Sequence, residues 1–225
     1  MRPLMIFAAG LGTRMRPLTN DRPKPLVQVA GQTLLDRALD LGRAAGCAPI
    51  AVNTHYLGHQ IRDHLAGQDV AISDEPQVIL DTGGGLRQAM PLLGPGPVMT
   101  LNPDVVWTGP NPLAALQDAW RDDMDALLAL VPLSRAVARL GAGDFAMDAQ
   151  GRISRQGDYV YAGAQIIRPE LLADIPDQVF SLNRLWDLMI ARGRAFGMVH
   201  PGGWCDVGRP EAIELAQGML ADARV

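Results

Sequence analysis

The sequence lacks the features that mark several broad classes of protein. Only two of its 225 residues are cysteine, Cys47 and Cys205, which excludes a disulfide framework and predicts a reducing compartment. No apolar run approaches the ~18 residues that a membrane-spanning helix needs. The 20 Lys and Arg residues are outnumbered by 24 Asp and Glu residues, so no basic excess favours nucleic acid. We therefore expect a cytoplasmic protein that binds neither membranes nor nucleic acids.

An alternation of short apolar runs with longer segments of helical spacing dominates the first half of the chain. Buried strands are predicted at 4–8, 49–53, 70–73, 98–102 and 126–131, and helices at 33–45, 56–66, 85–93 and 112–121. This order is typical of an α/β fold in which helices cover both faces of a mainly parallel sheet.

The pattern becomes shorter and more β-like at 145–167, where turns interrupt the apolar residues. Helical spacing returns at 169–174 and 182–192, and Pro210 is expected to open a last helix that ends near residue 221. Since no linker, repeat or low-complexity tract divides the chain, we predict a single domain, 1–225, with a small inserted β-rich portion.

A glycine-rich loop directly follows the first predicted strand. It reads Ala8-Ala9-Gly10-Leu11-Gly12-Thr13-Arg14-Met15-Arg16-Pro17-Leu18-Thr19, and Pro23-Lys24-Pro25-Leu26 comes next. Glycines after a strand let backbone N–H groups approach phosphate oxygens, and the cations Arg14 and Lys24 suit a triphosphate. No Gly-Lys-Ser/Thr closes a Walker motif, and Met15 replaces the third glycine of the dinucleotide fingerprint. A shorter Gly-x-Gly would more simply be a tight surface turn.

The whole string resembles the signature of the sugar-1-phosphate nucleotidylyltransferases. The resemblance implies a Rossmann-like, mixed, mainly parallel α/β domain. It also implies an enzyme that joins a nucleoside triphosphate to a sugar 1-phosphate and releases pyrophosphate. On the same basis Lys24 and Arg14 are expected to be catalytic. The residues expected to bind the nucleotide in this loop are Ala9, Gly10, Gly12, Thr13, Arg14 and Lys24.

A second glycine cluster, Leu80-Asp81-Thr82-Gly83-Gly84-Gly85, precedes a segment of helical spacing. Three glycines would let the backbone approach a flat ligand such as a base, although a helix N-terminus capped by Asp81 or Thr82 explains the cluster more simply when it is taken alone. The family resemblance implies that Thr82 and Gly83 help to hold the nucleobase and ribose. Either Glu75 or Gln77, just upstream, could read the edge of the base.

Two acidic residues near apolar runs are candidates for metal ligands. Asp104 follows a predicted strand, at the edge where α/β sheets bind ligands, and Asp206 lies in Trp204-Cys205-Asp206-Val207-Gly208. Each could be a turn residue, whereas carboxylates combined with phosphate oxygens suit Mg²⁺. The resemblance implies that Asp104 and Asp206 hold this ion. Pro103 replaces the glycine that usually precedes the first carboxylate, which stiffens the turn and removes one backbone donor.

The resemblance also implies which residues contact the acceptor, the sugar 1-phosphate. Asn102 is expected to contact the sugar phosphate, and Gly143 and Asp158 are expected to contact the sugar. The chain would then consist of a mainly nucleotide-binding half, 1–110, a mainly sugar-binding half with the second metal ligand, 111–208, and a C-terminal helix, 209–225. Its length leaves no room for the acyltransferase or regulatory segments of longer relatives, and no feature of the sequence sets the oligomeric state.

Within the family, the 80–85 loop, the short length and residues 204–208 most resemble members that transfer uridylyl from UTP to N-acetylmuramate 1-phosphate, in peptidoglycan recycling. The alternative substrate pairs are dTTP with glucose 1-phosphate, GTP with mannose or heptose 1-phosphate, and CTP with phosphocholine. A non-catalytic nucleotide-sensing module of the same fold is a further alternative. Such a module would be expected to lose Lys24 or a metal carboxylate, and all three residues are present.

Overall fold

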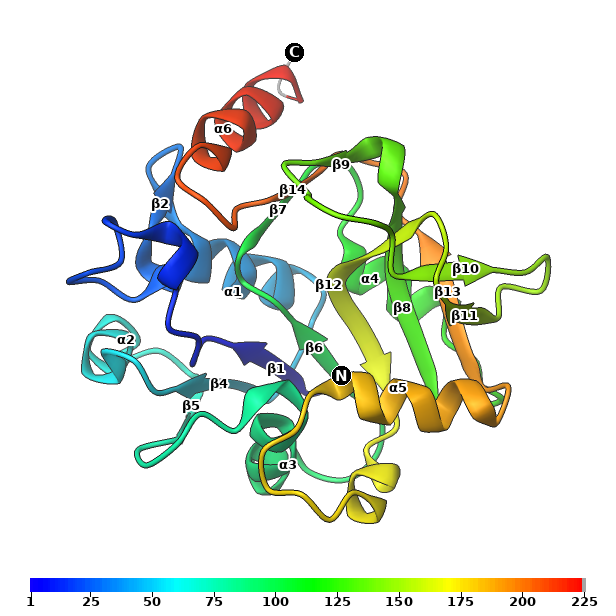
Figure 1. Ribbon diagram of the computed structural model, residues 1–225. Helices are drawn as coiled ribbons and strands as arrows, with labels where there is room; N and C mark the ends of the chain where they lie inside the picture. Colours follow the sequence, from blue (N-terminus) through cyan, green and yellow to red (C-terminus); the bar gives the residue numbers. More distant parts are fainter. Residues whose placement is uncertain (224–225) are drawn as a thin grey trace.

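The computed structural model describes residues 1–223 and is built around one nine-stranded sheet (Figure 1). Seven of the strands lie in the order β11 (Ile153–Arg155), β10 (Phe145–Met147), β12 (Tyr159–Ile167), β6 (Val98–Leu101), β1 (Leu4–Phe7), β4 (Ile50–Thr54) and β5 (Ala71–Asp74). The other two are β8 (Ala126–Pro132), which pairs with β12, and β13 (Ala195–Val199), which pairs with β8. The sheet therefore takes strands from both halves of the sequence.

The direction of the strands changes at β12. Strands β6, β1, β4 and β5 are all parallel, as the alternation of strands and helices predicts. Strand β12 runs antiparallel to both β6 and β8, and β13 is again parallel to β8. The mixed, mainly parallel sheet is thus confirmed. Because parallel strands end at the same edge, the loops that follow β1, β4, β5 and β6 emerge together.

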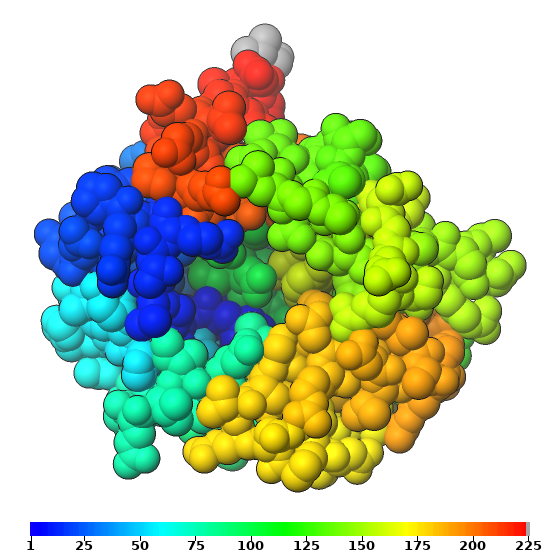
Figure 2. Space-filling model, viewed as in Figure 1, coloured from blue at the N-terminus to red at the C-terminus, as the bar shows by residue number. Residues whose placement is uncertain are grey.

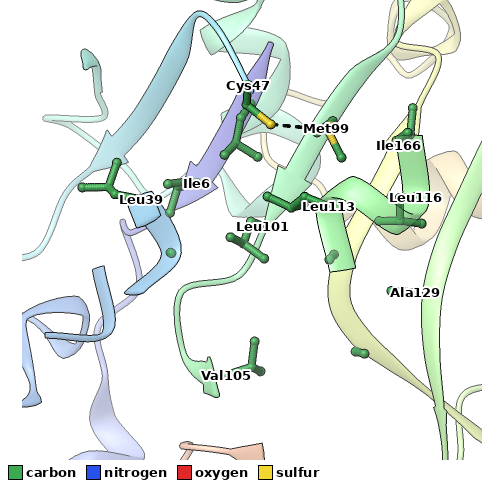
Figure 3. Packing of buried hydrophobic residues seen from close by; sticks show 14 of the residues in the cluster. Ile6, Leu39, Cys47, Met99, Leu101, Val105, Leu113, Leu116, Ala129 and Ile166 are labelled. Atoms are coloured by element: carbon green, nitrogen blue, oxygen red, sulfur yellow. Dashed lines mark hydrogen bonds between the residues drawn. The ribbon is translucent and has the colours of Figure 1, made fainter. Parts of the chain in front are cut away.

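Helices cover both faces of the sheet. One buried cluster joins it to α1 (Leu34–Ala44), α2 (Gly58–His64) and α4 (Pro112–Ala119), and another joins it to α3 (Asp81–Leu93) and α5 (Leu182–Ala191). Side chains alternate along a strand, so Leu4 and Ile6 of β1 belong to the first cluster and Met5 belongs to the second. Figure 3 shows part of the first cluster, where Cys47 Sγ lies 3.6 Å from Met99 Sδ.

Three helices begin where a side chain caps the free backbone N–H groups. Thr33 Oγ1 accepts a hydrogen bond from Asp36 N at the start of α1, at 3.0 Å. Asn111 Oδ1 caps α4 in the same way, and Pro112 then occupies the first turn, where its missing N–H costs nothing. Ser181 caps α5. These short polar residues define helix starts that apolar spacing alone locates only approximately.

Several element boundaries differ from the predicted ones. The helix expected at 85–93 begins at Asp81, so residues 83–85 lie inside its first turns rather than in a loop. Residues 170–174 form a 3-10 helix, because Pro169 and Pro176 leave room only for a short turn. The last helix, α6 (Ala212–Asp222), begins after Pro210 because residues 209–213 first form a tight turn. Residues 224–225 of the predicted C-terminal segment lie outside the described residues.

Two small sheets were not predicted from the sequence, because strands of two or three residues carry no measurable periodicity. They consist of β7 (Val105–Trp107), β14 (Trp204–Asp206) and β9 (Ala136–Val137), and of the pair β2 (Gln28–Val29) and β3 (Gln32–Thr33). Strand β14 runs antiparallel to β7, which brings the end of the chain back beside the end of β6. None of the helices within 1–223 is both long enough and apolar enough to span a bilayer.

Both cysteines are buried and free, which predicts low reactivity. Burial raises the pKa of the Cys47 thiol to about 11, and burial together with the charge of Asp206 raises that of Cys205 to about 11. At about pH 8 only roughly 0.1% of each thiol would be the reactive thiolate. We expect slow modification of the native protein by DTNB and prompt modification of both thiols in urea. Rapid stoichiometric labelling of the native protein would contradict this prediction.

Candidate active site

The loops at the carboxyl edge of β1, β5 and β6 surround a cleft made of two adjoining cavities. The loop cavity, of about 240 Å³, is lined by residues 7–10 and by the ends of β4, β5 and β6. The insertion cavity, of about 320 Å³, is lined by residues of the β9–β12 region and of α5. Both cavities include Asp81, Thr82, Asn102 and Asp104 in their walls. Figure 2 shows this hollow, with the N-terminal segment in blue at its rim.

Gly12 determines the shape of the glycine-rich loop. Its φ of +62° lies in the left-handed region, and a Cβ there would lie 3.0 Å from Lys24 Cβ and 3.2 Å from Thr19 Cγ2. The Thr19 hydroxyl donates to the carbonyl oxygen of Gly12 at 2.8 Å. Ala9 and Gly10 line the loop cavity, and a Cβ at Gly10 would meet no atom within 4 Å. The backbone at this point is therefore open to an approaching ligand.

Lys24 lines the loop cavity, and its partner Asp104 lines both cavities. Of the 20 Lys and Arg residues in the chain, Lys24 is the only lysine. Its Nζ lies 2.6 Å from Asp104 Oδ2, and the two side chains are 11% and 30% exposed. A charge-assisted hydrogen bond that is shielded from water to this extent is stronger than a surface ion pair. The pair joins the loop after β1 to the loop after β6.

A second carboxylate, Asp206, lies beside this pair. It stands opposite Val105 in the β7–β14 ladder and lines the insertion cavity together with Asp104. Burial, and then repulsion by Asp104, raise the pKa of Asp206, and neighbouring cations offset part of the rise. Within 1–223, no three His, Cys, Asp or Glu side chains cluster as a complete metal site. A magnesium ion needs only one or two protein carboxylates when phosphates supply further oxygens.

Of the remaining candidates in the glycine-rich loop, Arg14 lies close to these carboxylates, whereas Thr13 lines neither cavity. Thr13 and Arg14 belong to the 3-10 helix η1 (Thr13–Met15), and both side chains are exposed. Arg14 lines the insertion cavity, and its charge is one of those that lower the pKa of Asp206. Arg14, Asp104 and Asp206 therefore line the insertion cavity together, and Lys24 contacts Asp104 from the loop cavity.

The glycines of α3 serve helix packing in this structure. The amide of Gly83 donates to the carbonyl oxygen of Phe180 at 2.9 Å, and a Cβ at Gly83 would overlap the Phe180 ring. A Cβ at Gly84 would overlap the carbonyl oxygen of Gln178. Thr82, in contrast, lines both cavities, and its Oγ1 accepts from Leu182 N at 3.0 Å. Nucleotide contacts by Thr82 and Gly83 remain predictions.

A buried polar network forms the inner wall of the loop cavity. Asn53 accepts a hydrogen bond from Ala8 N at 2.6 Å and donates one to Glu75 Oε1 at 2.7 Å. The other oxygen of Glu75 accepts from Leu80 N at 2.8 Å. Glu75 is only 2% exposed, yet it lines the loop cavity, whereas Gln77 is exposed and lies outside its lining. The carboxylate of Glu75 therefore already has structural partners on both oxygens.

The three residues predicted for the acceptor lie in different surroundings. Asn102 lines both cavities, and its backbone N–H donates to the carbonyl oxygen of Gly163 at 2.7 Å. A Cβ at Gly143 would overlap the carbonyl oxygen of Gly157, so this glycine permits a close backbone contact. Asp158 is exposed and is not part of either cavity lining. Sugar contacts by Gly143 and Asp158 remain predictions.

Most of the insertion cavity was not predicted from the sequence. Its further lining residues are Val105, Arg139, Asp144, Arg155, Tyr161, Gly163, Ser181, Leu182, Asn183, Trp186 and Trp204. Three of them had a local signal, because Val105, Asp144 and Trp204 lie within two residues of the candidates Asp104, Gly143 and Asp206 in the sequence. The other residues are spread over the second half of the chain without a motif, and only the fold brings them together.

A model of the MobA-like NTP transferase domain matches residues 4–199. The chain belongs to this family. The family resemblance carried by the glycine-rich loop is confirmed, and the protein is a nucleotidyltransferase. The matched residues include the glycine-rich loop and both cavities up to the start of β14.

Two curated relatives match this nucleotidyltransferase over nearly its whole length. The N-acetylmuramate alpha-1-phosphate uridylyltransferase of Caulobacter vibrioides is 42% identical and covers 97% of each chain. The enzyme of the same name from Neisseria meningitidis is 35% identical and covers 96% of each chain. A structure of a putative glucose-1-phosphate thymidylyltransferase from Bacillus anthracis, at 15% identity, has a TM-score of 0.83 over 99% of this chain and 96% of its own. That likeness shows the shared fold.

The polar network makes Gly85 intolerant of a side chain. A Cβ at this position would lie 2.8 Å from Glu75 Oε1 and 3.0 Å from Asn53 Nδ2. We expect Gly85→Ala to lower the free energy of unfolding by about 1–3 kcal/mol in urea denaturation. Gly218→Ala is the matched control, because Gly218 lies exposed in α6 with no atom within 4 Å of its Cβ position. The control should be neutral or stabilising by up to about 1 kcal/mol, and equal effects would contradict the prediction.

Proposed function

We propose that this nucleotidyltransferase transfers the uridylyl group of UTP to N-acetylmuramate 1-phosphate and releases pyrophosphate. The observation that supports it most is the Lys24–Asp104 pair at the junction of the two cavities, with Asp206 beside it. Two anionic substrates must meet in such a reaction. A cation paired with a carboxylate that lines both cavities is placed to neutralise both of them.

The reaction requires alignment and charge neutralisation more than an acid or a base. An oxygen of the acceptor phosphate attacks the α-phosphorus in line, and the bond from that phosphorus to the pyrophosphate oxygen breaks. In this scheme the backbone at Gly12 and Thr13 cradles the phosphates. Lys24 exchanges its contact with Asp104 for the α-phosphate and the attacking phosphate, and Arg14 neutralises the leaving pyrophosphate.

The chemistry of the two carboxylates fits a magnesium ion. Asp104 and Asp206 offer the hard oxygen ligands that this ion prefers. Burial and then repulsion by Asp104 raise the pKa of Asp206, and a divalent cation would relieve that repulsion. We propose that these two residues hold Mg²⁺. When bound, the ion would supply positive charge at the reacting phosphates. Its arrival would also leave the Lys24 ammonium available for a phosphate oxygen.

The names of the two curated relatives support the choice of substrates, since both are N-acetylmuramate alpha-1-phosphate uridylyltransferases. The loop cavity would take the nucleotide and the insertion cavity the sugar, with Asn102 between them. The thiols of Cys47 and Cys205 are free, which suits the reducing cytoplasm that we propose as the compartment.

A pyrophosphate-release assay with a grid of substrate pairs tests this proposal. The purified protein and Mg²⁺ are incubated with UTP, dTTP, GTP or CTP, each with N-acetylmuramate, glucose, mannose or heptose 1-phosphate or with phosphocholine. We expect the highest kcat/KM with UTP and N-acetylmuramate 1-phosphate, and the nucleotide sugar identified by mass spectrometry. A better pair elsewhere in the grid would replace the substrates, and no release with any pair would favour a nucleotide-sensing role.

Substitution of Lys24 tests its assigned role. Lys24→Ala should lower kcat by at least about 10²-fold, because a charge that stabilises the transition state is lost. Lys24→Arg should still lower kcat by at least about 10-fold, because a guanidinium pairs with Asp104 through a rigid fork and cannot exchange partners as an ammonium does. Arg22→Lys, at an exposed neighbouring position, is the matched control and should leave kcat unchanged. Wild-type turnover in Lys24→Arg would contradict the assignment.

A further inference from the structure

The insertion cavity carries positive charge away from the reacting phosphates. Besides Arg14, which lies near Asp206, two more guanidinium groups line it, those of Arg139 and Arg155. The acceptor of the proposed reaction has a second anionic group, the lactyl carboxylate, two ring carbons from the carbon that bears the phosphate. N-acetylglucosamine 1-phosphate lacks this group. If the proposed function is correct, a residue of the insertion cavity must recognise this carboxylate, and the inference rests on that function.

The guanidinium of Arg155 is already committed to the structure. Its Nε donates to Asp187 Oδ1 at 2.8 Å, and its Nη atoms donate to Asn183 Oδ1 at 2.9 Å and to Asn183 O at 2.8 Å. It also lies 5.0 Å from the centre of the Phe145 ring and 5.5 Å from that of Trp186. Arg155 therefore attaches β11 to the start of α5, and its donors are directed at that helix.

The guanidinium of Arg139 is oriented by a carboxylate, but not all of its N–H donors have an acceptor. Its Nη2 donates to Asp144 Oδ1 at 2.9 Å, and the other oxygen of Asp144 accepts from Tyr161 N at 2.9 Å. The pair is thus oriented by the backbone of β12. The Nε of Arg139 is buried and has no hydrogen-bond partner among residues 1–223. A guanidinium has five N–H donors, and the Arg139 side chain lines the insertion cavity and is 30% exposed, so donors besides the one on Asp144 remain for an acceptor in the cavity.

We propose that Arg139 binds the lactyl carboxylate and thereby selects N-acetylmuramate 1-phosphate over sugar phosphates without that group. A guanidinium and a carboxylate match in shape and charge, and a partly buried site strengthens the pair. In the proposed mechanism the acceptor phosphate already has Lys24 beside the two metal carboxylates. Arg139 lies on the same cavity wall, near enough to Asp206 for its charge to act there, so a sugar anchored at the phosphate would place its carboxylate on this wall.

Steady-state kinetics of Arg139→Gln with two acceptors test the proposal, at saturating UTP and Mg²⁺. For N-acetylmuramate 1-phosphate we expect kcat/KM to fall by about 10- to 100-fold, through KM rather than kcat. N-acetylglucosamine 1-phosphate is measured either as a slow substrate or as a competitive inhibitor. Its kcat/KM, or its inhibition constant, should change by less than about threefold. Arg139→Lys should recover part of the kcat/KM that Arg139→Gln loses, because lysine restores the positive charge but lacks the planar pair of N–H donors of a guanidinium.

Arg152→Gln is the matched control, because Arg152 is an exposed cation of the same β-rich insertion that lies outside the cavity lining. It should leave both constants unchanged, and thermal melting of each variant verifies its fold. An equal loss with both acceptors would place Arg139 at the phosphate and overturn the proposal, and so would no loss with either. A wild-type protein that forms no UDP-N-acetylmuramate would instead overturn the proposed function, together with the inference that rests on it.

Discussion

The ion pair between Lys24 and Asp104 is the contact on which the site depends. The two residues are 80 positions apart, and they meet because β1 and β6 are neighbouring parallel strands whose loops leave the sheet at one edge. Gly12 makes the meeting possible, since a side chain there would collide with Lys24. The charges are therefore oriented before any substrate arrives, and in the proposed mechanism little reorganisation is needed when a phosphate replaces the carboxylate as the partner of the ammonium.

A buried polar network and a bend in β12 determine the shape of the two cavities around this pair. On the nucleotide side, Asn53 and Glu75 bind the backbone at Ala8 and Leu80, and buried polar groups of this kind tolerate no change of register, because each would lose its partner. On the acceptor side, β12 changes register at Gly163, whose φ is +91°. This irregularity lets the strand approach Asn102 closely, so one backbone bend shapes the boundary between the two cavities.

The sequence predicted those parts of the fold that have long local signals. The strands of the parallel half appear as apolar runs, and the glycine-rich loop is a long continuous motif. The approach of Asp206 to Asp104 rests instead on the three-residue strands β7 and β14, which leave no periodic trace. The packing of Gly83 against Phe180 was not predicted, because Phe180 lies far from Gly83 in the sequence. Arg139 was not predicted as a site residue either, because the backbone of β12 orients its partner Asp144 and the sequence does not show that contact.

The use of lysine at a single position is itself informative about the chemistry. Apart from the four histidines, every other basic side chain in the sequence is arginine, including those that pair with the carboxylates of Asp144 and Asp187. Arginine suits such fixed pairs, because its planar fork binds two acceptors and loses little freedom in doing so. In the proposed mechanism the ammonium of Lys24 must instead leave an oxygen of Asp104 for a phosphate oxygen as the substrates bind. A compact ammonium on a flexible stem can rotate between partners, whereas a bidentate guanidinium would remain with Asp104. The lysine therefore stands at the one point of the site where the cation has to move.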